Sequence, residues 1–525
     1  MNKPSLKIII TTDVHGNIAD EPALGRIGYA RLKAWREAAE KAGHTVFLLD
    51  AGDVFSGSAY TEVDQGCSVA KLLGLLGYRL LTPGNHDFDY NESAGNPLYY
   101  SEVLVETVRR AGNCPVDVVA QNLSRNGQTI YGLTRNPVII FDETDKYPDG
   151  RRVIVTGVVS PYTLRPSLRG SLPGYEFGLL ETASETKEKI LSDLSASLKQ
   201  FDRPGDVVLV LSHLGYPDPE GVPAQVALDH VAIAQAEHDE LYGSDLATVP
   251  NVDFVVDGHS HTTVSPKKIG QAWYANGGRY LENFLEITLD DKGQRTMVHR
   301  NYGQTADLIP DCDIEAYLRE LEKRHGLNDI ILVNPDPELF SLADLKTDNM
   351  ALGRLICSIM MQATGAELAL HTVGGIRAGL SAGPIRVRDF YDVLPFKDEL
   401  VTVTLSGHEL VALLNRGSGC GGHGILQFYG FSAYAWPKPN GGLKVEGLRM
   451  DNGLPVDLAK NYRAAINGFL AKNMTKPTEN HGDLVQALRL GLESNFNIEN
   501  LRLNRRLFVF SDPAEARTAW EKSLK

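Results

Sequence analysis

Residue types that bind metal ions recur at the ends of five apolar stretches of the sequence. Each stretch is rich in β-branched residues and is followed within a few positions by Asp, His or Asn. Carboxylate and imidazole groups suit Zn²⁺, Mn²⁺ or Fe²⁺ better than a thiolate-preferring metal. Together they supply enough ligands for two metal ions. The five sites are IIITTDVHGN (Asp13, His15), VFLLDAGD (Asp53), RLLTPGNHDFD (Asn85, His86, Asp87, Asp89), VVLVLSHLG (His213) and VDFVVDGHSH (Asp257, His259, His261).

The apolar stretches have the pattern of buried β-strands, which would bring these side chains together. Each is short and bounded by Gly, Pro or Asp. In an α/β sheet, the carboxyl ends of parallel strands line one edge, and ligands bind there. Asp13-x-His15 and His259-x-His261 would each place two ligands on the same side of an extended chain, because alternate strand residues share a face. The sequence therefore predicts a metal centre at one sheet edge.

The strand and helix patterns around these residues indicate a chain of two domains. Strand patterns alternate with helical patterns up to about residue 303, which is typical of an α/β domain. A polar helical pattern, DCDIEAYLRELEKRH, then ends at Gly326, a typical helix C-cap. We expect a metal-binding domain over 1–310, a connecting helix over 311–327 and a second domain over 328–525.

Composition excludes several classes of protein. The net charge of −14 disfavours binding of long nucleic acids, which depends on neutralising phosphates, although a local metal cluster can still bind a small anion. The five cysteines form no CxxC pair, which indicates reduced thiols. No apolar run reaches the length of about 18 residues that suggests a membrane span.

The start, MNKPSLKIII, predicts a cytoplasmic protein as written, or a periplasmic or secreted one if a leader has been removed. The oligomeric state is left open.

The order of the motifs adds specificity. The series D-x-H, G-D, G-N-H-D, H and G-H-x-H resembles the calcineurin-like metallophosphatases, and the fuller forms TTDVHGN, PGNHDFD and DGHSHT resemble their 5′-nucleotidase branch. VGGIRAG, DVLPFKDELVTVTLSGHEL and GILQFYG are similar to the substrate-binding C-terminal domain of that branch. The resemblance implies a four-layer α/β/β/α sandwich followed by a smaller α+β domain.

The resemblance also implies two metal ions that share one carboxylate. Such ions lower the pKa of water, so that hydroxide can attack phosphorus in line, and they neutralise charge on the phosphoryl oxygens. Asp87 and Asp257 are expected to be structural. The implied ligands are Asp13, His15, Asp53 and His261 for one ion and Asp53, Asn85, His213 and His259 for the other, with Asp53 bridging.

His86 and Asp89 form the implied catalytic dyad. Asp89 would orient His86, which would stabilise the transition state or protonate the leaving oxygen. The alternative is that Asp89 only caps the following turn.

The second domain would contact the rest of the substrate. Arg377 follows two glycines and could clamp phosphate through two hydrogen bonds, as the resemblance also implies. Phe469 and Phe428 fall at or near positions where family members stack the nucleobase. The alternatives are that either ring belongs to the core, or that Tyr429 stacks instead of Phe428.

The sequence departs from the family pattern at three places in this domain. Thr372 replaces the Asn of N-x-G-G-x-R, and Lys397 and Asp398 follow Phe396 where the pattern is PFxN. The run F-L-x-x-G-G-D-G, which supplies a ribose-binding Asp, is absent, and Asp483 lies beyond its spacing. We expect altered ribose recognition.

The predicted function is a dimetal phosphohydrolase that releases phosphate from nucleoside 5′-monophosphates or related small esters. One alternative is a 2′,3′-cyclic-nucleotide phosphodiesterase and 3′-nucleotidase, or a nucleotide-sugar hydrolase. The other is a non-catalytic nucleotide- or metal-binding protein.

Overall fold

The chain folds into two compact units, which meet in sequence between His325 and Gly326. The helix expected as a connector over 311–327 is α10 (Cys312–His325), and it belongs to the first unit. None of the described helices combines the length and apolarity needed to cross a bilayer. The computed structural model describes residues 5–112, 115–143, 150–163, 172–216, 241–290, 292–336, 338–342, 348–395, 398–417, 424–438, 442–472, 474–493 and 506–523.

Two six-stranded mixed sheets form the centre of the first unit. The strands that precede the predicted ligands run parallel within each sheet, so their carboxyl ends lie at one edge. The first sheet has the order β14 (Arg295–Asn301), β13 (Asn283–Leu289), β1 (Leu6–Thr11), β2 (Thr45–Asp50), β3 (Tyr78–Leu81) and β4 (Asp117–Val118). The second has the order β11 (Thr263–Ile269), β12 (Ala272–Gly277), β10 (Phe254–Asp257), β9 (Asp206–His213), β7 (Arg152–Val159) and β6 (Val138–Asp142).

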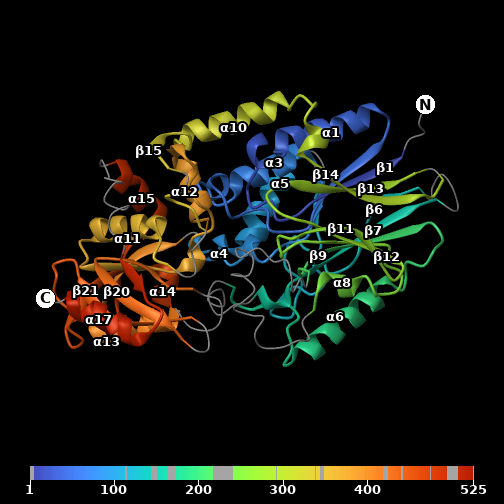
Figure 1. Cartoon of the computed structure of the whole chain (residues 1–525). Coiled ribbons are helices and arrows are strands. Elements are labelled where there is room, and N and C mark those ends of the chain that lie inside the picture. The colour runs from blue at the N-terminus through green and yellow to red at the C-terminus, as the bar shows by residue number, and fades with distance from the viewer. Residues whose placement is uncertain are drawn as a thin grey trace. The chain divides into compact units, whose positions relative to one another are not determined.

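The two sheets pack face to face, and helices cover their outer faces (Figure 1). Ile8 and Ile10 of the first sheet share one core with Leu209 of the second, whereas Val208 points the other way and packs with Leu194 of a covering helix. Alternate strand residues thus fill two separate cores. The predicted four-layer α/β/β/α sandwich is confirmed. The covering helices are α1 (Tyr29–Lys41) and α3 (Cys67–Leu76) on the first sheet, and α6 (Ala183–Leu198) and α8 (Gly243–Leu246) on the second.

Local sequence explains where these helices begin. Thr182 precedes α6 and accepts a hydrogen bond from the Glu185 backbone N–H at 3.2 Å, while the Glu185 carboxylate accepts one from the Thr182 N–H at 3.1 Å. This capping box satisfies N–H groups that the first helical turn leaves unpaired. Shorter elements of the first unit are α2 (Ala59–Glu62), α4 (Tyr90–Ser93), a π-helix (Tyr100–Val105), α5 (Glu106–Ala111), α9 (Tyr302–Thr305), β5 (Ser124–Arg125) and β8 (Tyr175–Glu176).

The second unit is the predicted α+β domain, built on a five-stranded sheet with a core on each face. The sheet has the order β19 (Gln427–Tyr429), β16 (Leu368–His371), β22 (Asn461–Asn467), β18 (Glu399–Ser406) and β23 (Thr478–Asp483). Helices α11 (Ala351–Thr364), α12 (Val387–Val393) and α15 (Leu484–Glu493) pack on one face. The other face packs against α13 (Gly407–Gly417) and the sheet of β21 (Leu443–Met450), β20 (Phe431–Pro437) and β24 (Leu507–Val509). The remaining elements are β15 (Ile330–Asn334), β17 (Gly383–Arg386), α14 (Gly468–Lys472) and α17 (Pro513–Ser523).

Candidate metal centre

The loops that follow the parallel strands are joined by backbone hydrogen bonds. The N–H of Asp13, after β1, donates to the Gly52 carbonyl at 2.9 Å, and that of His15 donates to the Asp53 carbonyl at 2.9 Å. The loops thereby bring their side chains to one place. Two groups of potential ligands result, in each of which all ligand atoms lie within 4.8 Å of one another: Asp13, His15 and His261, and Asp53, His213 and His259.

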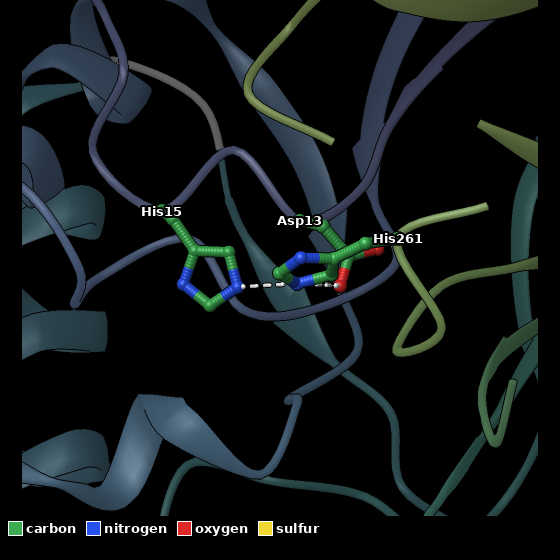
Figure 2. Close-up of side chains that lie close together, drawn as sticks. All are labelled: Asp13, His15 and His261. Carbon is green, nitrogen blue, oxygen red and sulfur yellow. Dashed lines mark hydrogen bonds and ion pairs between the residues drawn. The ribbon is translucent and has the colours of Figure 1, made fainter. Parts of the chain in front are cut away.

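Figure 2 shows the first group, in which three side chains from two loops converge. The Nε2 atoms of His15 and His261 lie 3.0 Å apart, and His261 Nε2 lies 3.5 Å from Asp13 Oδ1. Two ligand atoms on one tetrahedral zinc ion, each about 2.1 Å from it, lie about 3.4 Å apart. The observed separations therefore suit a shared metal ion.

One carboxylate oxygen of Asp53, itself a member of the second group, lies close to a histidine of each group. Its Oδ2 lies 3.0 Å from His213 Nε2 in the second group and 3.6 Å from His15 Nε2 in the first. The other oxygen, Oδ1, accepts a hydrogen bond from the His86 backbone N–H at 2.7 Å. This is the arrangement expected of a carboxylate that bridges two ions.

Unpartnered buried atoms support the presence of cations. His213 Nε2 is buried and has no partner with hydrogen-bond geometry among the described residues, although Asp53 Oδ2 is 3.0 Å away. Both amide atoms of Asn85, a residue 2% exposed, also lack a partner there. A buried polar group left unpaired costs about 1–3 kcal/mol. Metal ions would satisfy His213 Nε2 and Asn85 Oδ1, so these residues fit the ions that the sequence implies.

Backbone carbonyls hold the imidazole rings in the orientation that metal binding needs. Nδ1 of His15 lies 2.8 Å from the Ser56 carbonyl oxygen, and Nδ1 of His213 lies 2.8 Å from that of Ala51. A carbonyl can only accept, so each Nδ1 carries the proton and Nε2 keeps its lone pair. Such contacts beyond the ligands fix the tautomer of a metal-binding histidine.

In the metal-free site, burial and the charges of neighbouring side chains shift the pKa values of the predicted ligands in opposite directions. Burial alone would lower the pKa of His213, but the charges of Asp53 and Asp13 raise it above its usual value. Burial would raise the pKa of Asp53, yet the histidines hold it well below its usual range. Burial lowers the pKa of His15 to about 4. A cation bound at this site would compete with a proton for His213 Nε2.

His86 and Asp89 lie within hydrogen-bonding distance of each other. His86 Nδ1 is 2.8 Å from Asp89 Oδ2, and the centroid of the His86 ring is 5.6 Å from that of His15. Both side chains are largely buried, at 14% and 26% exposed. The carboxylate therefore orients the ring beside the first group of ligands.

The backbone at the ligands differs from the extended geometry expected for the two D-x-H and H-x-H pairs. Asp13 and His15 have φ values of 49° and 47°, and His259 and His261 have 74° and 55°. That prediction is wrong, because the chain turns sharply at the strand end instead of continuing as a strand. Asp53 has the same left-handed conformation, with a φ of 57°.

Asp87 anchors the loops that carry two predicted ligands. Its Oδ2 accepts hydrogen bonds from the backbone N–H groups of Asp53 at 3.0 Å and Gly84 at 2.8 Å. Its Oδ1 accepts from those of Val54 at 2.9 Å and Phe55 at 3.0 Å. Asp87 thus serves as the structural residue that the sequence suggested, with contacts that its position alone did not reveal.

Asp257 has a similar structural role at the loop after β9. Its carboxylate accepts from the backbone N–H of Leu214 at 3.1 Å and from the Tyr274 hydroxyl at 2.9 Å. Leu214 directly follows His213, so these bonds help to fix that predicted ligand.

Sequence reasoning missed Tyr280. Its backbone N–H donates to the Asp13 carbonyl at 2.8 Å, and its ring centroid lies 5.7 Å from that of His261 and 6.0 Å from that of His15. Tyr280 therefore contacts all three members of the first group. No motif marks it, because these contacts join segments far apart in the sequence.

The predicted substrate-binding residues of the second unit lie in different surroundings. Arg377 follows a 3₁₀ turn (Val373–Gly375), and Phe469 of α14 is 53% exposed. Phe428 is fully buried, with its ring stacked on that of Phe431 at 4.6 Å between centroids and 7° between planes. The stacking role expected of Phe428 needs an open ring face, so its burial in the core argues against that role.

Comparison with known proteins identifies both units. Residues 6–263 match the family described as calcineurin-like phosphoesterase, and residues 333–478 match the 5′-nucleotidase C-terminal domain. A probable 5′-nucleotidase of Treponema pallidum is 23% identical, over 89% of this chain and 86% of its own length. The trifunctional nucleotide phosphoesterase protein YfkN of Bacillus subtilis is also 23% identical, but this chain spans only 32% of its length.

A solved structure shows the same fold over nearly the whole chain. The 5′-nucleotidase precursor from Thermus thermophilus superposes with a TM-score of 0.65 at 23% identity, over 97% of this chain and 100% of that one. The chain belongs to the 5′-nucleotidase family of calcineurin-like phosphoesterases, and it is a metal-dependent phosphoester hydrolase.

Proposed function

We propose that the protein releases phosphate from nucleoside 5′-monophosphates or related small phosphate esters. The observation that carries the proposal is the position of Asp53 Oδ2, which lies 3.0 Å from His213 Nε2 and 3.6 Å from His15 Nε2. One carboxylate oxygen is thus shared by two groups of ligands. This arrangement serves hydrolysis of a phosphate ester, in which two ions neutralise charge on the phosphoryl group.

Seven residues would hold the two ions, which we propose to be Zn²⁺, Mn²⁺ or Fe²⁺ because the donors are imidazole, carboxylate and amide. When bound, the ions would lower the pKa of water and polarise the phosphoryl oxygens. The proposed ligands are Asp13, His15, His261 and Asp53 for one ion and Asp53, Asn85, His213 and His259 for the other.

His86 is the proposed catalytic side chain. Asp89 Oδ2 accepts the proton of His86 Nδ1 at 2.8 Å, so proton transfer to or from the substrate would use Nε2. A protonated His86 ring can stabilise phosphoryl charge or protonate the leaving oxygen.

In the second unit we propose that Arg377 binds phosphate and that Phe469 stacks on the base. A guanidinium can hold two phosphate oxygens at once, and the half-exposed ring of Phe469 offers a face to any nucleobase. Because stacking does not depend on base identity, we expect modest base preference.

A phosphate-release screen tests the function. The purified protein, loaded separately with Zn²⁺, Mn²⁺ or Fe²⁺, is assayed on AMP, UMP, 2′,3′-cyclic AMP, UDP-glucose and bis-p-nitrophenyl phosphate. We expect the highest kcat/KM for AMP and UMP. Faster hydrolysis of a diester or of UDP-glucose would favour the alternative activities, and metal binding without any hydrolysis would indicate a binding protein. Asp53→Ala, which removes the shared oxygen, is the inactive control.

A further inference from the structure

A partly exposed carboxylate in the second unit contacts the segment that carries Phe469. Asp398 Oδ1 accepts hydrogen bonds from the backbone N–H groups of Phe469 at 3.0 Å and Glu399 at 2.9 Å. The fit is tight, because a Cβ at Gly468 would come within 2.8 Å of the same oxygen. Asp398 therefore fixes the first turn of α14, from which the Phe469 ring projects.

The other oxygen of Asp398 reaches the segment that leads to Arg377. Asp398 Oδ2 accepts from Asn467 Nδ2 at 2.7 Å, and the same Nδ2 lies 3.2 Å from Thr372 Oγ1. In return, Asn467 Oδ1 accepts from the Thr372 backbone N–H at 3.2 Å. Asn467 is fully buried. The side chains of Asp398 and Asn467 thus connect the ends of β16 and β22 to the start of β18.

Two departures from the family pattern meet in this network. Thr372 and Asp398 both stand where the pattern has Asn, and Asn467 lies between them and bonds to each. An ionised carboxylate has no proton to donate, and Asp398 accepts from Phe469, Glu399 and Asn467. A charged acceptor also makes these bonds stronger than neutral ones.

We infer that Asp398 is a positioning residue that holds the Phe469 ring in place, with Asn467 linking it to Thr372. It thereby sets the affinity for the nucleoside part of the substrate without touching the substrate itself. This inference rests on the proposed function, because it assigns Asp398 the task of placing the ring proposed to stack on the base.

A double-mutant cycle on the metal-loaded full chain tests the inference. The variants are Asp398→Ala, Phe469→Leu and both together, and the substrates are AMP and p-nitrophenyl phosphate, which lacks a base and ribose. We expect Phe469→Leu to raise the KM for AMP about tenfold, since stacking contributes that much. Asp398→Ala should raise it by a similar factor, and the double variant should add little, because both changes remove the same ring placement. The KM for p-nitrophenyl phosphate should rise less than threefold throughout.

Two further variants separate positioning from general stability. Asp398→Asn keeps an oxygen for the Phe469 N–H but presents an amide to Asn467, so its KM for AMP should fall between those of wild type and Asp398→Ala. Asp457→Ala is the matched control, because Asp457 accepts the Ala459 backbone N–H at 2.9 Å in an exposed turn of the same unit. It should leave both KM values unchanged. Thermal unfolding of every variant shows whether the fold is intact, and if Asp398→Ala unfolds, Asp398→Asn replaces it in the cycle.

The outcomes distinguish the inference from the proposed function. If Phe469→Leu leaves the KM for AMP unchanged, the proposed stacking role is wrong. If Phe469→Leu raises that KM but the change at Asp398 does not, or if the two effects simply multiply, the positioning role of Asp398 is wrong.

Discussion

The backbone N–H of Asp53 donates to the Asp87 carboxylate at 3.0 Å, so the proposed bridging ligand is held by a residue outside both proposed ligand sets. Gly84, Val54 and Phe55 donate to the same carboxylate, which is 1% exposed. Four donors around one buried carboxylate leave the loops little freedom to move. Placement of the proposed bridging oxygen of Asp53 therefore depends on Asp87.

Asp87→Asn should destabilise the first unit and weaken metal binding. The amide keeps one acceptor oxygen but turns an NH₂ group toward backbone donors, and each donor left unpaired costs about 1–3 kcal/mol. We expect a lower unfolding temperature and less than two metal ions per chain by elemental analysis. Asp193→Asn on α6, whose carboxylate is 42% exposed beside Lys189, is the control and should change neither quantity. Full metal content in Asp87→Asn would contradict the anchoring role.

His86→Ala should lower kcat by about 10²–10⁴-fold and leave metal content unchanged, because His86 is proposed to act on the substrate and not on the ions. If His86 protonates the leaving oxygen, the loss should be larger for AMP than for p-nitrophenyl phosphate, whose leaving group needs no proton. Equal losses on both would instead indicate stabilisation of phosphoryl charge. His325→Ala at the end of α10 is the control. Near-normal turnover of His86→Ala on both esters would show that the His86–Asp89 dyad takes no part in catalysis.

Phe428 and Phe469 should respond to Leu substitution in opposite ways. Phe428→Leu leaves a gap beside Phe431 in the core and should lower the free energy of unfolding by about 1–3 kcal/mol, with the KM for AMP unchanged. Phe469→Leu should change that free energy by less than about 0.5 kcal/mol, as for most surface changes, and should raise the KM. Chemical denaturation and initial-rate kinetics on both variants measure this contrast. A raised KM in a fully stable Phe428→Leu would restore the stacking role for that ring.

His371 should make the second unit less stable in mild acid. Burial lowers the pKa of this β16 side chain to about 4, against about 6.5 in the unfolded chain. Between those values the unfolded state binds the extra proton, so the free energy of unfolding falls as pH decreases from about 6.5 towards 4. The expected loss at pH 5 is about 2 kcal/mol.

Urea unfolding of His371→Asn checks the assignment. The Asn amide can still donate to the Thr372 carbonyl, which lies 2.7 Å from His371 Nδ1, but it does not titrate. Its free energy of unfolding should therefore vary less than that of wild type between pH 7.5 and 5. An unchanged pH dependence would assign the effect to other groups.

The sequence predicted the parts of the site that depend on strand ends. Asp53 and His213 could be placed because apolar runs reveal buried strands, and parallel strands end at a common edge. The family resemblance then implied two overlapping sets of ligands, which stay a prediction. The fold class followed from the same alternation of strands and helices.

The remaining features depend on contacts that periodicity does not encode. Tyr280 reaches His15 and His261 from a distant segment, and only the folded chain shows it. Phe428 could not be distinguished from a binding residue, because aromatic rings in cores and in binding sites look alike in a sequence. The turns at Asp13 and His261 escaped notice for a similar reason, since neither residue is a glycine.

Five of the seven proposed ligands adopt a backbone conformation that L-residues avoid. A left-handed conformation costs an L-residue roughly 1–2 kcal/mol, and glycine at the same position avoids most of it. Glycine at His261, for example, would relieve this strain in the metal-free chain and would also remove a ligand. Selection for heat resistance of the metal-free chain would thus favour loss of the centre, and directed evolution under those conditions needs catalysis as a second criterion at these positions.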